Sequence, residues 1–466
     1  MNTSIFKAYD IRGIYPTDIN EEVFETVIAS IAHFFKQKLN NQSPKILLSR
    51  DMRVSSPSLY QVALKTLVAS GVQVIDADLL PTPTFYYGVL KHKYDGGIHV
   101  TASHNPKEYA GTKFVLRDGD QIIKIGKETG MNDIRELATN ESYPPYTNTG
   151  TVVQNRTILD EEVEEALADF DTSQLKPYRV VADPANGMGS LYLKKVFEHI
   201  PGTLSMINDE LDGTFPAHQA DPLDFDNLIP LQEEVKKEGA DFGVEPDGDG
   251  DRIFFVDEKG AVIPATMISA LIASQVLTHN PQANVIVDIR YTRNVTHVVE
   301  KHGGTLHISK VGHAFITQDV NRHEAFFAGE SSGHFYFGAN GGAESAVKVL
   351  LYVIDAMSRS GQPLSRVLES LHTSFESGER NFVLSVGTVA QDLVKKIAEK
   401  YKDGTVSELD GLAVDYADWR FNIRSSNTEP LLRLNVEADN EQLMQQHFET
   451  LTQLIIESGA SIKGSH

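Results

Sequence analysis

The chain has 466 residues, a length that predicts three or four domains at about 150 residues per domain. Hydrophobic residues make up 41% and charged residues 23%, which excludes a disordered or fibrous chain. The 42 Lys and Arg against 64 Asp and Glu give a formal net charge of −22. This field repels nucleic acids and anionic membranes, so we expect neither as a partner, and an anionic ligand needs a local basic pocket.

The sequence contains no cysteine, which excludes disulfides, thiolate metal sites and a cysteine nucleophile. The N-terminal segment MNTSIFKAYDIRGIYP has no basic stretch followed by an apolar one, so no secretory signal is predicted. The longest apolar stretch, around Ala346 to Ile354, is far shorter than the about 20 residues that span a bilayer. Together these features predict a soluble, cytoplasmic protein.

A strand, helix, strand succession begins after Pro44. The apolar segment KILLSRD is followed by the amphipathic segment SSPSLYQVALKTLVASG and by a second apolar segment, VQVIDADLLPTP. A strand and helix return at RVVADPANGMGS with LYLKKVFEHI, and again at NVIVDIRYTRN with VTHVVEKHG. These three segments predict parallel or mixed sheets covered by helices.

The domain boundaries follow from changes in this pattern. The run YPPYTNTGT, near Tyr143 to Thr151, resists both helix and strand and is predicted to be a linker. Beyond about Phe375 the pattern predicts strands interleaved with helices that begin near Ala390 and Asn440. We therefore predict an α/β protein with three similar mixed α/β domains, at residues 1–150, 151–257 and 258–372, and a smaller α+β domain at 373–466.

A serine-containing loop follows the predicted buried strand GGIHV. The loop Thr101-Ala102-Ser103-His104-Asn105-Pro106 places Ser103 at the carboxyl end of a sheet, where α/β proteins bind their ligands. A serine there can carry a phosphoryl group. The same residues also suit an ordinary Asx turn, which is the better interpretation on spacing alone.

The densest acidic cluster is DGDGDR, in which Asp247, Asp249 and Asp251 alternate with glycines between two predicted strands. Such a loop can fold its carboxylates around one hard cation such as Mg²⁺, although a solvated acidic turn is the alternative. A calcium EF-hand is excluded because Arg252 stands where that loop needs glycine and because the flanking segments are strands.

The segment GESSGH matches G-x-S-x-G, which would make Ser331 a hydrolase nucleophile. The following HFYF predicts a strand where a nucleophile elbow needs a helix, so we interpret the segment as a polar loop. It presents Glu330, Ser332 and His334, and a carboxylate with a hydroxyl suits sugar hydroxyls.

Two predicted strands flank the segment RSSNTEP, and Arg433 lies just beyond it. Arg424 together with hydroxyl and amide side chains suits a phosphate monoester. An ordinary hairpin turn without a ligand is the alternative. The segment that begins at Gly187 resembles a dinucleotide-binding motif, but Tyr192 replaces its last glycine. The pair Gly126-Lys127 resembles the end of a P-loop, but Glu128 replaces the Ser or Thr that should follow. Neither site is therefore predicted.

Taken in order, KAYDIRG, TASHNP, DGDGDR, GESSGH and RSSNTEP resemble the α-D-phosphohexomutase superfamily, in particular bacterial phosphomannomutase/phosphoglucomutase. The resemblance runs from Tyr9 to Arg433 and includes GTFPAHQADP and KVGH. It implies four domains around a central cleft, the last of them TATA-binding-protein-like. It also implies an isomerase that interconverts hexose 1-phosphate and hexose 6-phosphate of mannose and/or glucose.

The resemblance implies roles for named residues. Ser103 would be a phosphoserine, and with Asp247, Asp249 and Asp251 it would hold Mg²⁺, while a hexose 1,6-bisphosphate would be intermediate and activator. Lys113 would transfer protons with His104 and His313 in support, and Arg12 would shape the cleft floor. The implied substrate-binding residues are Tyr9, Arg252, Arg290, Lys310, His313, Glu330, Ser332, His334, Arg424, Ser426, Asn427, Thr428 and Arg433.

Three departures from the family pattern leave the sugar preference open. Arg290 stands where lysine is common, Ser331 stands where bifunctional relatives often carry methionine, and GANGGAESA is an unusually glycine-rich version of its segment. The alternatives are a phosphoglucosamine mutase, against which Asn427 argues, a metal-dependent sugar phosphatase, and a sugar-phosphate-binding protein with an inactive site. In each case we expect a phosphosugar as the small-molecule partner, and a monomer or homodimer.

Overall fold

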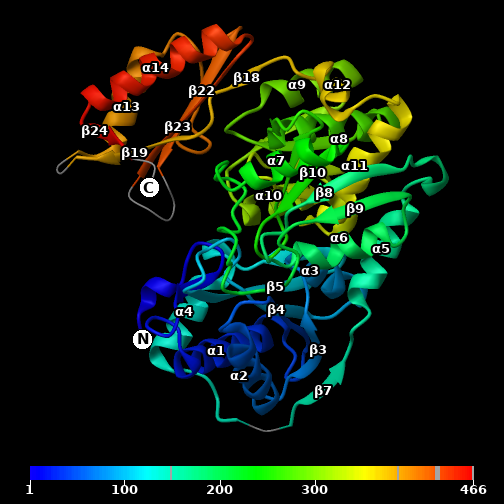
Figure 1. The fold of residues 1–466 in the computed structure, drawn as a ribbon. Helices are drawn as coiled ribbons and strands as arrows, with labels where there is room; N and C mark the ends of the chain where they lie inside the picture. The colour runs from blue at the N-terminus through cyan, green and yellow to red at the C-terminus, as the bar shows by residue number, and fades with distance from the viewer. Residues whose placement is uncertain (147–148, 386–387, 426–430, 464–466) are drawn as a thin grey trace.

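The computed structural model describes residues 1–146, 149–385, 388–425 and 431–463. In this part of the chain four β-sheets follow one another, each with its own helices. Figure 1 shows the blue N-terminal unit and the orange to red C-terminal unit at opposite ends, with the green and yellow units beside both. The predicted fold class, three mixed α/β units and a smaller α+β unit, is confirmed.

The first unit is built around the sheet β1-β5-β4-β2-β3-β7, with β6 paired to β5. Its elements, besides short helical turns at Thr3–Ile5 and Lys127–Met131, are β1 (Ile11–Ile14), α1 (Glu21–Leu39), β2 (Lys45–Arg50), α2 (Ser56–Ala69), β3 (Gln73–Leu79), α3 (Thr82–Lys91), β4 (Gly96–Val100), β5 (Tyr109–Asp118), β6 (Gln121–Lys124), α4 (Asn132–Asn140) and β7 (Thr151–Gln154). Because β7 pairs with β3, the chain leaves this sheet only after Gln154.

The second and third units follow the same plan. The second contains α5 (Ile158–Ala168), a turn at Thr172–Gln174, β8 (Tyr178–Ala182), α6 (Gly189–Phe197), β9 (Gly202–Met206), α7 (Ile229–Glu238), β10 (Phe242–Pro246), β11 (Ile253–Asp257) and β12 (Val262–Ile263). The third contains α8 (Ala265–His279), β13 (Asn284–Asp288), α9 (Arg293–His302), β14 (Thr305–Ser309), α10 (His313–Arg322), β15 (Phe327–Gly329), β16 (Phe335–Phe337), a turn at Gly338–Asn340, β17 (Ala343–Glu344), α11 (Ala346–Ser360) and α12 (Leu364–Glu369).

These three units share one strand topology. In each, the first strand pairs in parallel with the second and third, and the third pairs antiparallel with the fourth. The four strands are β2, β3, β4 and β5 in the first unit, β8, β9, β10 and β11 in the second, and β13, β14, β15 and β16 in the third. Loops at one position of this topology therefore have counterparts in the other units.

The fourth unit has the sheet β20-β21-β22-β23-β19-β24, with β18 paired to β23. Its elements are β18 (Phe375–Glu376), β19 (Arg380–Leu384), α13 (Ala390–Lys400), β20 (Thr405–Ser407), β21 (Leu412–Asp415), β22 (Trp419–Ser425), β23 (Leu431–Ala438), α14 (Glu441–Glu457) and β24 (Ala460–Ile462). The buried Glu437 accepts hydrogen bonds from the backbone nitrogens of Thr292 and Arg293, which anchors this unit to the third.

The four units do not each have a separate hydrophobic core. One hydrophobic cluster runs through the second and third units, whereas the first and fourth have clusters of their own. Helix α8 belongs to the shared cluster, since eleven of its residues are buried. Within the described residues, no helix combines the length and the apolar character that a membrane crossing requires.

Candidate active site

Three polar loops leave the sheets at equivalent positions, between the third and fourth strands of their units. Ser103 lies between β4 and β5, the aspartates 247, 249 and 251 between β10 and β11, and Glu330 to His334 between β15 and β16. The three third strands are almost completely buried, which holds the start of each loop firmly. The repeated fold thus brings loops from three distant parts of the sequence to the same kind of sheet edge, where α/β proteins bind ligands.

The serine loop has a constrained backbone. Ser103 adopts a φ of 52°, in the left-handed region that residues with a side chain rarely occupy. Its backbone nitrogen donates to the hydroxyl of Thr101 (2.9 Å), and its carbonyl oxygen accepts from the buried Arg53 (2.6 Å). Arg53 is a residue that the sequence analysis missed, and its only signal was a charged residue just after a predicted buried strand.

The serine loop contacts the acidic loop directly. The Ser103 hydroxyl lies 3.4 Å from Oδ2 of Asp247. A Cβ atom added at Gly248 would lie only 2.7 Å from the carbonyl oxygen of Ser103, so the two backbones meet where glycine leaves room. The predicted phosphorylation position and the first of the predicted metal ligands therefore lie side by side.

The three aspartates fit a hard divalent cation. They are buried, and they offer oxygens that lie within 4.8 Å of one another. Oδ1 of Asp249 is buried and has no hydrogen-bond partner within the described residues. Burial and the neighbouring Asp251 and Asp249 raise the pKa of Asp247 well above its usual range. Clustered carboxylate oxygens of this kind suit Mg²⁺.

Lys113 reaches the same aspartates. Its ammonium group donates to Oδ2 of Asp249 (2.7 Å) and to Asp251, and the hydroxyl of Thr82, which the sequence analysis missed, also donates to Asp249. Burial opposes the charge on Lys113, but the two aspartates outweigh it and raise the pKa of Lys113 well above its usual range. This shift is the opposite of what a lysine base needs near neutral pH.

Of the implied proton-transfer groups, His104 lies next to the serine. Its Nδ1 is 3.1 Å from the hydroxyl oxygen of Ser103. Burial, together with Arg252 and Arg12, lowers the pKa of His104 well below its usual range, so the imidazole is neutral at physiological pH. Arg12 itself pairs with Asp10 (2.7 Å) and donates to Asn105 of the serine loop.

The loop from Glu330 to His334 joins the acidic loop through His334. The Nε2 of His334 lies 3.1 Å from Oδ1 of Asp251, and its Nδ1 lies 3.1 Å from Glu330 and 3.0 Å from the hydroxyl of Ser332. Burial opposes protonation of His334, but Asp251 and Glu330 outweigh it and raise its pKa to about 9. His334 is therefore a cation that connects two carboxylates.

Arg290 and Arg252 each anchor an acidic residue near the loops. Arg290 pairs with Asp288 (2.9 Å) and with Glu330 (3.4 Å). The buried guanidinium group of Arg290 therefore fixes the glutamate of the third loop. Arg252 donates to Asp221 (3.1 Å), which lies in the segment GTFPAHQADP. Ser331 bonds Asp288 through its hydroxyl (2.8 Å), an arrangement that does not resemble an activated nucleophile.

A cavity of about 270 Å³ lies between the first, third and fourth units. Tyr9, Lys310, Asp410 and Gly411 are among the residues that line it. The ring of Tyr9 packs edge-on against His313 at a centroid distance of 5.3 Å. Burial, Asp410 and Glu330 raise the pKa of Tyr9 above its usual range. Residues of the third and fourth units therefore influence the ionisation of a tyrosine of the first unit.

Arg424 and Arg433 lie on neighbouring strands of the fourth unit. Both approach Glu379, at 3.8 Å and 3.2 Å respectively. Burial and the nearby Arg290 lower the pKa of Arg424, a shift that a bound anion would reverse. The other predicted phosphate-binding residues, Ser426, Asn427 and Thr428, lie outside the described residues.

Family models match the chain in four consecutive parts: phosphoglucomutase/phosphomannomutase α/β/α domain I at residues 3–143, domain II at 161–260, domain III at 264–375, and the C-terminal domain at 386–453. With the fold and the three converging loops, these matches define a phosphohexomutase, an isomerase of phosphosugars. The chain belongs to the phosphoglucomutase/phosphomannomutase family of the α-D-phosphohexomutase superfamily.

Similar proteins cover nearly the whole chain. It is 36% identical to a phosphomannomutase of Methanocaldococcus jannaschii, over 98% of this chain and 99% of that protein, and 34% identical to a phosphomannomutase of Escherichia coli K12, over 97% and 99%. A protein of Xanthomonas campestris described as phosphohexose mutases is 35% identical, over 98% and 99%. The crystal structure of a phosphoglucomutase/phosphomannomutase family protein from Burkholderia thailandensis matches with a TM-score of 0.88 at 28% identity, covering 99% of both chains.

Proposed function

We propose that this phosphohexomutase interconverts the 1-phosphates and 6-phosphates of mannose and/or glucose through a phosphoserine at Ser103. The observation that carries the proposal is the 3.4 Å approach of the Ser103 hydroxyl to Asp247, within a ring of three buried aspartates. A phosphoryl group on that oxygen would face the aspartates, and Mg²⁺ held there would neutralise the charge that an attacking hydroxyl must approach.

The transfer follows from this arrangement. A sugar hydroxyl attacks phosphorus, the bond between phosphorus and the Ser103 oxygen breaks, and the hydroxyl proton passes to a nearby base. The serine oxygen leaves beside the neutral imidazole of His104, while Lys113 neutralises charge on Asp249 and Asp251. The product of this step is a hexose 1,6-bisphosphate, which turns over and returns its other phosphoryl group to the serine.

The two ends of such a ligand have candidate binding groups. Glu330 and Ser332, which contact Arg290 and His334, would bind the sugar hydroxyls. Arg424 and Arg433 would hold the distal phosphate together with Ser426, Asn427 and Thr428, because guanidinium groups and hydroxyls suit a phosphate dianion. Tyr9 and Lys310 line the cavity of about 270 Å³, and His313 packs against the ring of Tyr9.

The relatives from Methanocaldococcus jannaschii and Escherichia coli are phosphomannomutases, which supports mannose phosphate as one substrate. The phosphohexose mutases of Xanthomonas campestris support a wider range of hexoses. The decisive experiment is a panel of mannose, glucose and glucosamine 1-phosphates, followed by phosphorus NMR with Mg²⁺ and a catalytic amount of bisphosphate.

Ser103→Ala should abolish conversion to the 6-phosphate, whereas Ser331→Ala should retain most of it. Active Ser103→Ala protein would contradict the proposal. Release of inorganic phosphate that matches substrate loss would instead identify a sugar phosphatase, and tight binding without any conversion would identify an inactive binding protein.

A further inference from the structure

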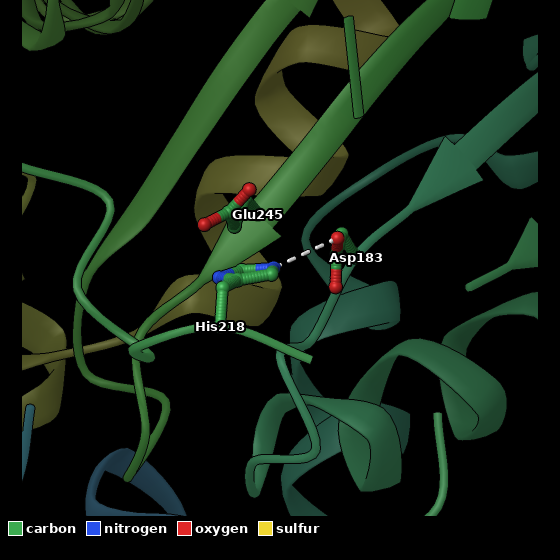
Figure 2. Close-up of side chains that lie close together, drawn as sticks. All are labelled: Asp183, His218 and Glu245. Carbon is green, nitrogen blue, oxygen red and sulfur yellow. Dashed lines mark hydrogen bonds and ion pairs between the residues drawn. The ribbon is translucent and has the colours of Figure 1, made fainter. Parts of the chain in front are cut away.

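A second acidic cluster with a histidine lies in the second unit, outside the three active-site loops. Asp183 directly follows β8, Glu245 lies in β10, and His218 comes from the loop between β9 and α7 (Figure 2). One potential ligand atom from each of the three lies within 4.8 Å of the others. Both carboxylates are completely buried, and 12% of the His218 side chain is exposed.

Comparison of the three α/β units shows that this cluster lacks an arginine that the other two units have. Each α/β unit has an aspartate at the end of its first strand whose Oδ1 accepts a hydrogen bond from the backbone nitrogen two residues later: Asp51 (2.9 Å), Asp183 (2.9 Å) and Asp288 (2.8 Å). In the first and third units the residue two positions later is an arginine that pairs with the aspartate, Arg53 or Arg290. In the second unit that position holds Ala185.

The third unit also shows the role of the arginine that the second unit lacks. There the neighbouring strand places Glu330 beside Asp288, and Arg290 pairs with both carboxylates. The second unit has the same neighbouring carboxylates, because the backbone nitrogen of Asp183 bonds the carbonyl of Val244 and Glu245 follows. Both carboxylate oxygens of Glu245 are buried without a hydrogen-bond partner in the described part of the chain. A buried carboxylate without a partner is costly unless a proton or a bound cation compensates its charge.

His218 is oriented as a metal ligand. Its Nδ1 lies 3.0 Å from the carbonyl oxygen of Gln219, which can only accept, so Nδ1 carries a proton. Nε2 lies 3.0 Å from Oδ2 of Asp183 (Figure 2), where a proton on Nε2 would join the two groups as an ion pair. A divalent cation can replace that proton and bind the same nitrogen and oxygen, since metal binding releases protons from its ligands. Asp183 is itself fixed by Asn208, whose amide donates to both carboxylate oxygens at 3.1 Å. Outer hydrogen bonds of both kinds are typical of metal sites.

We propose that Asp183, His218 and Glu245 form a second divalent-cation site, of the zinc class and distinct from the Mg²⁺ position at the DGDGDR loop. One imidazole nitrogen and two carboxylate oxygens suit zinc better than magnesium, which prefers oxygen donors alone. A zinc ion with ligand bonds of about 2.0–2.2 Å separates its ligands by roughly 3.3–3.5 Å, so the present spacing needs only small side-chain movements.

The site would stabilise the loop that supports the active-site loops. His218 is followed by Gln219, which donates to the carbonyl of His104, and by Asp221, which binds Arg252. A cation that ties His218 to β8 and β10 would therefore restrain a segment that contacts both the serine loop and the acidic loop. This inference does not depend on the proposed phosphoryl transfer.

The test uses the full-length protein, dialysed against Zn²⁺ with excess Mg²⁺ to fill the DGDGDR loop, followed by metal analysis. Wild type should retain about one equivalent of zinc, and Glu245→Gln and His218→Ala should retain almost none. Glu162→Gln is the matched control, since Glu162 is another buried glutamate of the second unit with an unpartnered oxygen but lies outside the cluster, and it should retain zinc as wild type does.

Anomalous diffraction at the zinc edge, on wild-type crystals grown with both metals, avoids any effect of substitution on folding. A peak between the three side chains would support the proposal. It would be overturned by a wild-type protein that retains no more zinc than Glu245→Gln, or by a zinc peak found only at the DGDGDR loop.

Discussion

The hydroxyl oxygen of Ser103 lies 3.4 Å from Oδ2 of Asp247, although 144 residues separate them in the sequence. The contact depends on glycine, because a Cβ at Gly248 would lie 2.7 Å from the Ser103 carbonyl oxygen. That clash is with backbone, so it cannot be relieved by rotating a side chain, and the two loops must separate. This relationship gives a direct test of whether their spacing matters for catalysis.

We expect Gly248→Ala to lower turnover about 100-fold with little loss of stability, since misplacement of reacting groups by about 1 Å has effects of that size. Steady-state kinetics with glucose 1-phosphate and thermal unfolding measure the two quantities. Gly404→Ala is a matched control, because its added Cβ would also be crowded, at 2.5 Å from a Val414 side-chain atom in the fourth unit, away from the loops. Equal losses of activity in both variants would contradict the prediction.

The strands that carry the active-site loops could be predicted from the sequence because their signals are local. Continuous apolar runs such as GGIHV and IFFVD end at glycine-rich or polar segments, and the structure confirms them as β4 and β11. The strand after Gly333 that excludes a nucleophile elbow is confirmed as β16. Helix α1 is not among the predicted elements, although Asn20 caps its N-terminus through a hydrogen bond from the backbone nitrogen of Val23.

The contacts of the site could not be predicted in the same way. Ser103 adopts a left-handed backbone conformation against its intrinsic preference, and the buried Arg53 and Thr82 acquire their roles through partners from distant segments. Such choices depend on tertiary packing, which overrides local propensity. The equivalence of Asp51, Asp183 and Asp288 likewise emerges only when the three sheets are compared.

Removal of the Lys113 charge should make the protein more dependent on Mg²⁺. In Lys113→Met the buried aspartates lose their ammonium partner, which costs about 3–5 kcal/mol when one member of a buried ion pair is removed. We expect a lower melting temperature in EDTA than that of wild type and a larger increase on addition of Mg²⁺. Lys124→Met, which breaks the buried pair with Glu344, is the control and should show the wild-type response to Mg²⁺. Identical Mg²⁺ responses in wild type and Lys113→Met would refute this account.

Arg290 should set the position of Glu330, because its planar guanidinium reaches Asp288 and Glu330 at once. Lysine keeps the positive charge but lacks the planar set of donors with which arginine binds both carboxylates at once. We expect Arg290→Lys to raise KM for the sugar phosphate about tenfold with a smaller change in kcat, since only sugar binding is loosened. Phosphorylation of Ser103 by the bisphosphate, followed by intact mass, should be preserved. A loss of that phosphorylation would place Arg290 in the transfer step instead.

Glu162 should make stability fall as the pH rises through neutrality. Burial raises the pKa of this carboxyl to about 7, although the hydroxyl of Thr84 donates to it and opposes the shift. The pKa in the folded state therefore exceeds that in the unfolded state, so the folded protein binds the proton more tightly. The stabilisation is complete below about pH 4.5 and is lost as the pH rises through about 7. Its full size is about 3 kcal/mol at 1.36 kcal/mol per pKa unit.

Glutamine cannot ionise, so Glu162→Gln should unfold at a similar temperature to wild type at pH 5.5 and at a higher temperature at pH 8.5. The comparison of thermal unfolding at these two pH values, without added metal, isolates the contribution of the one carboxyl. Glu164→Gln, two positions along the same helix and exposed, is the control and should follow the wild-type pH profile. If wild type and Glu162→Gln lost stability in parallel between the two pH values, Glu162 would not be the group that titrates.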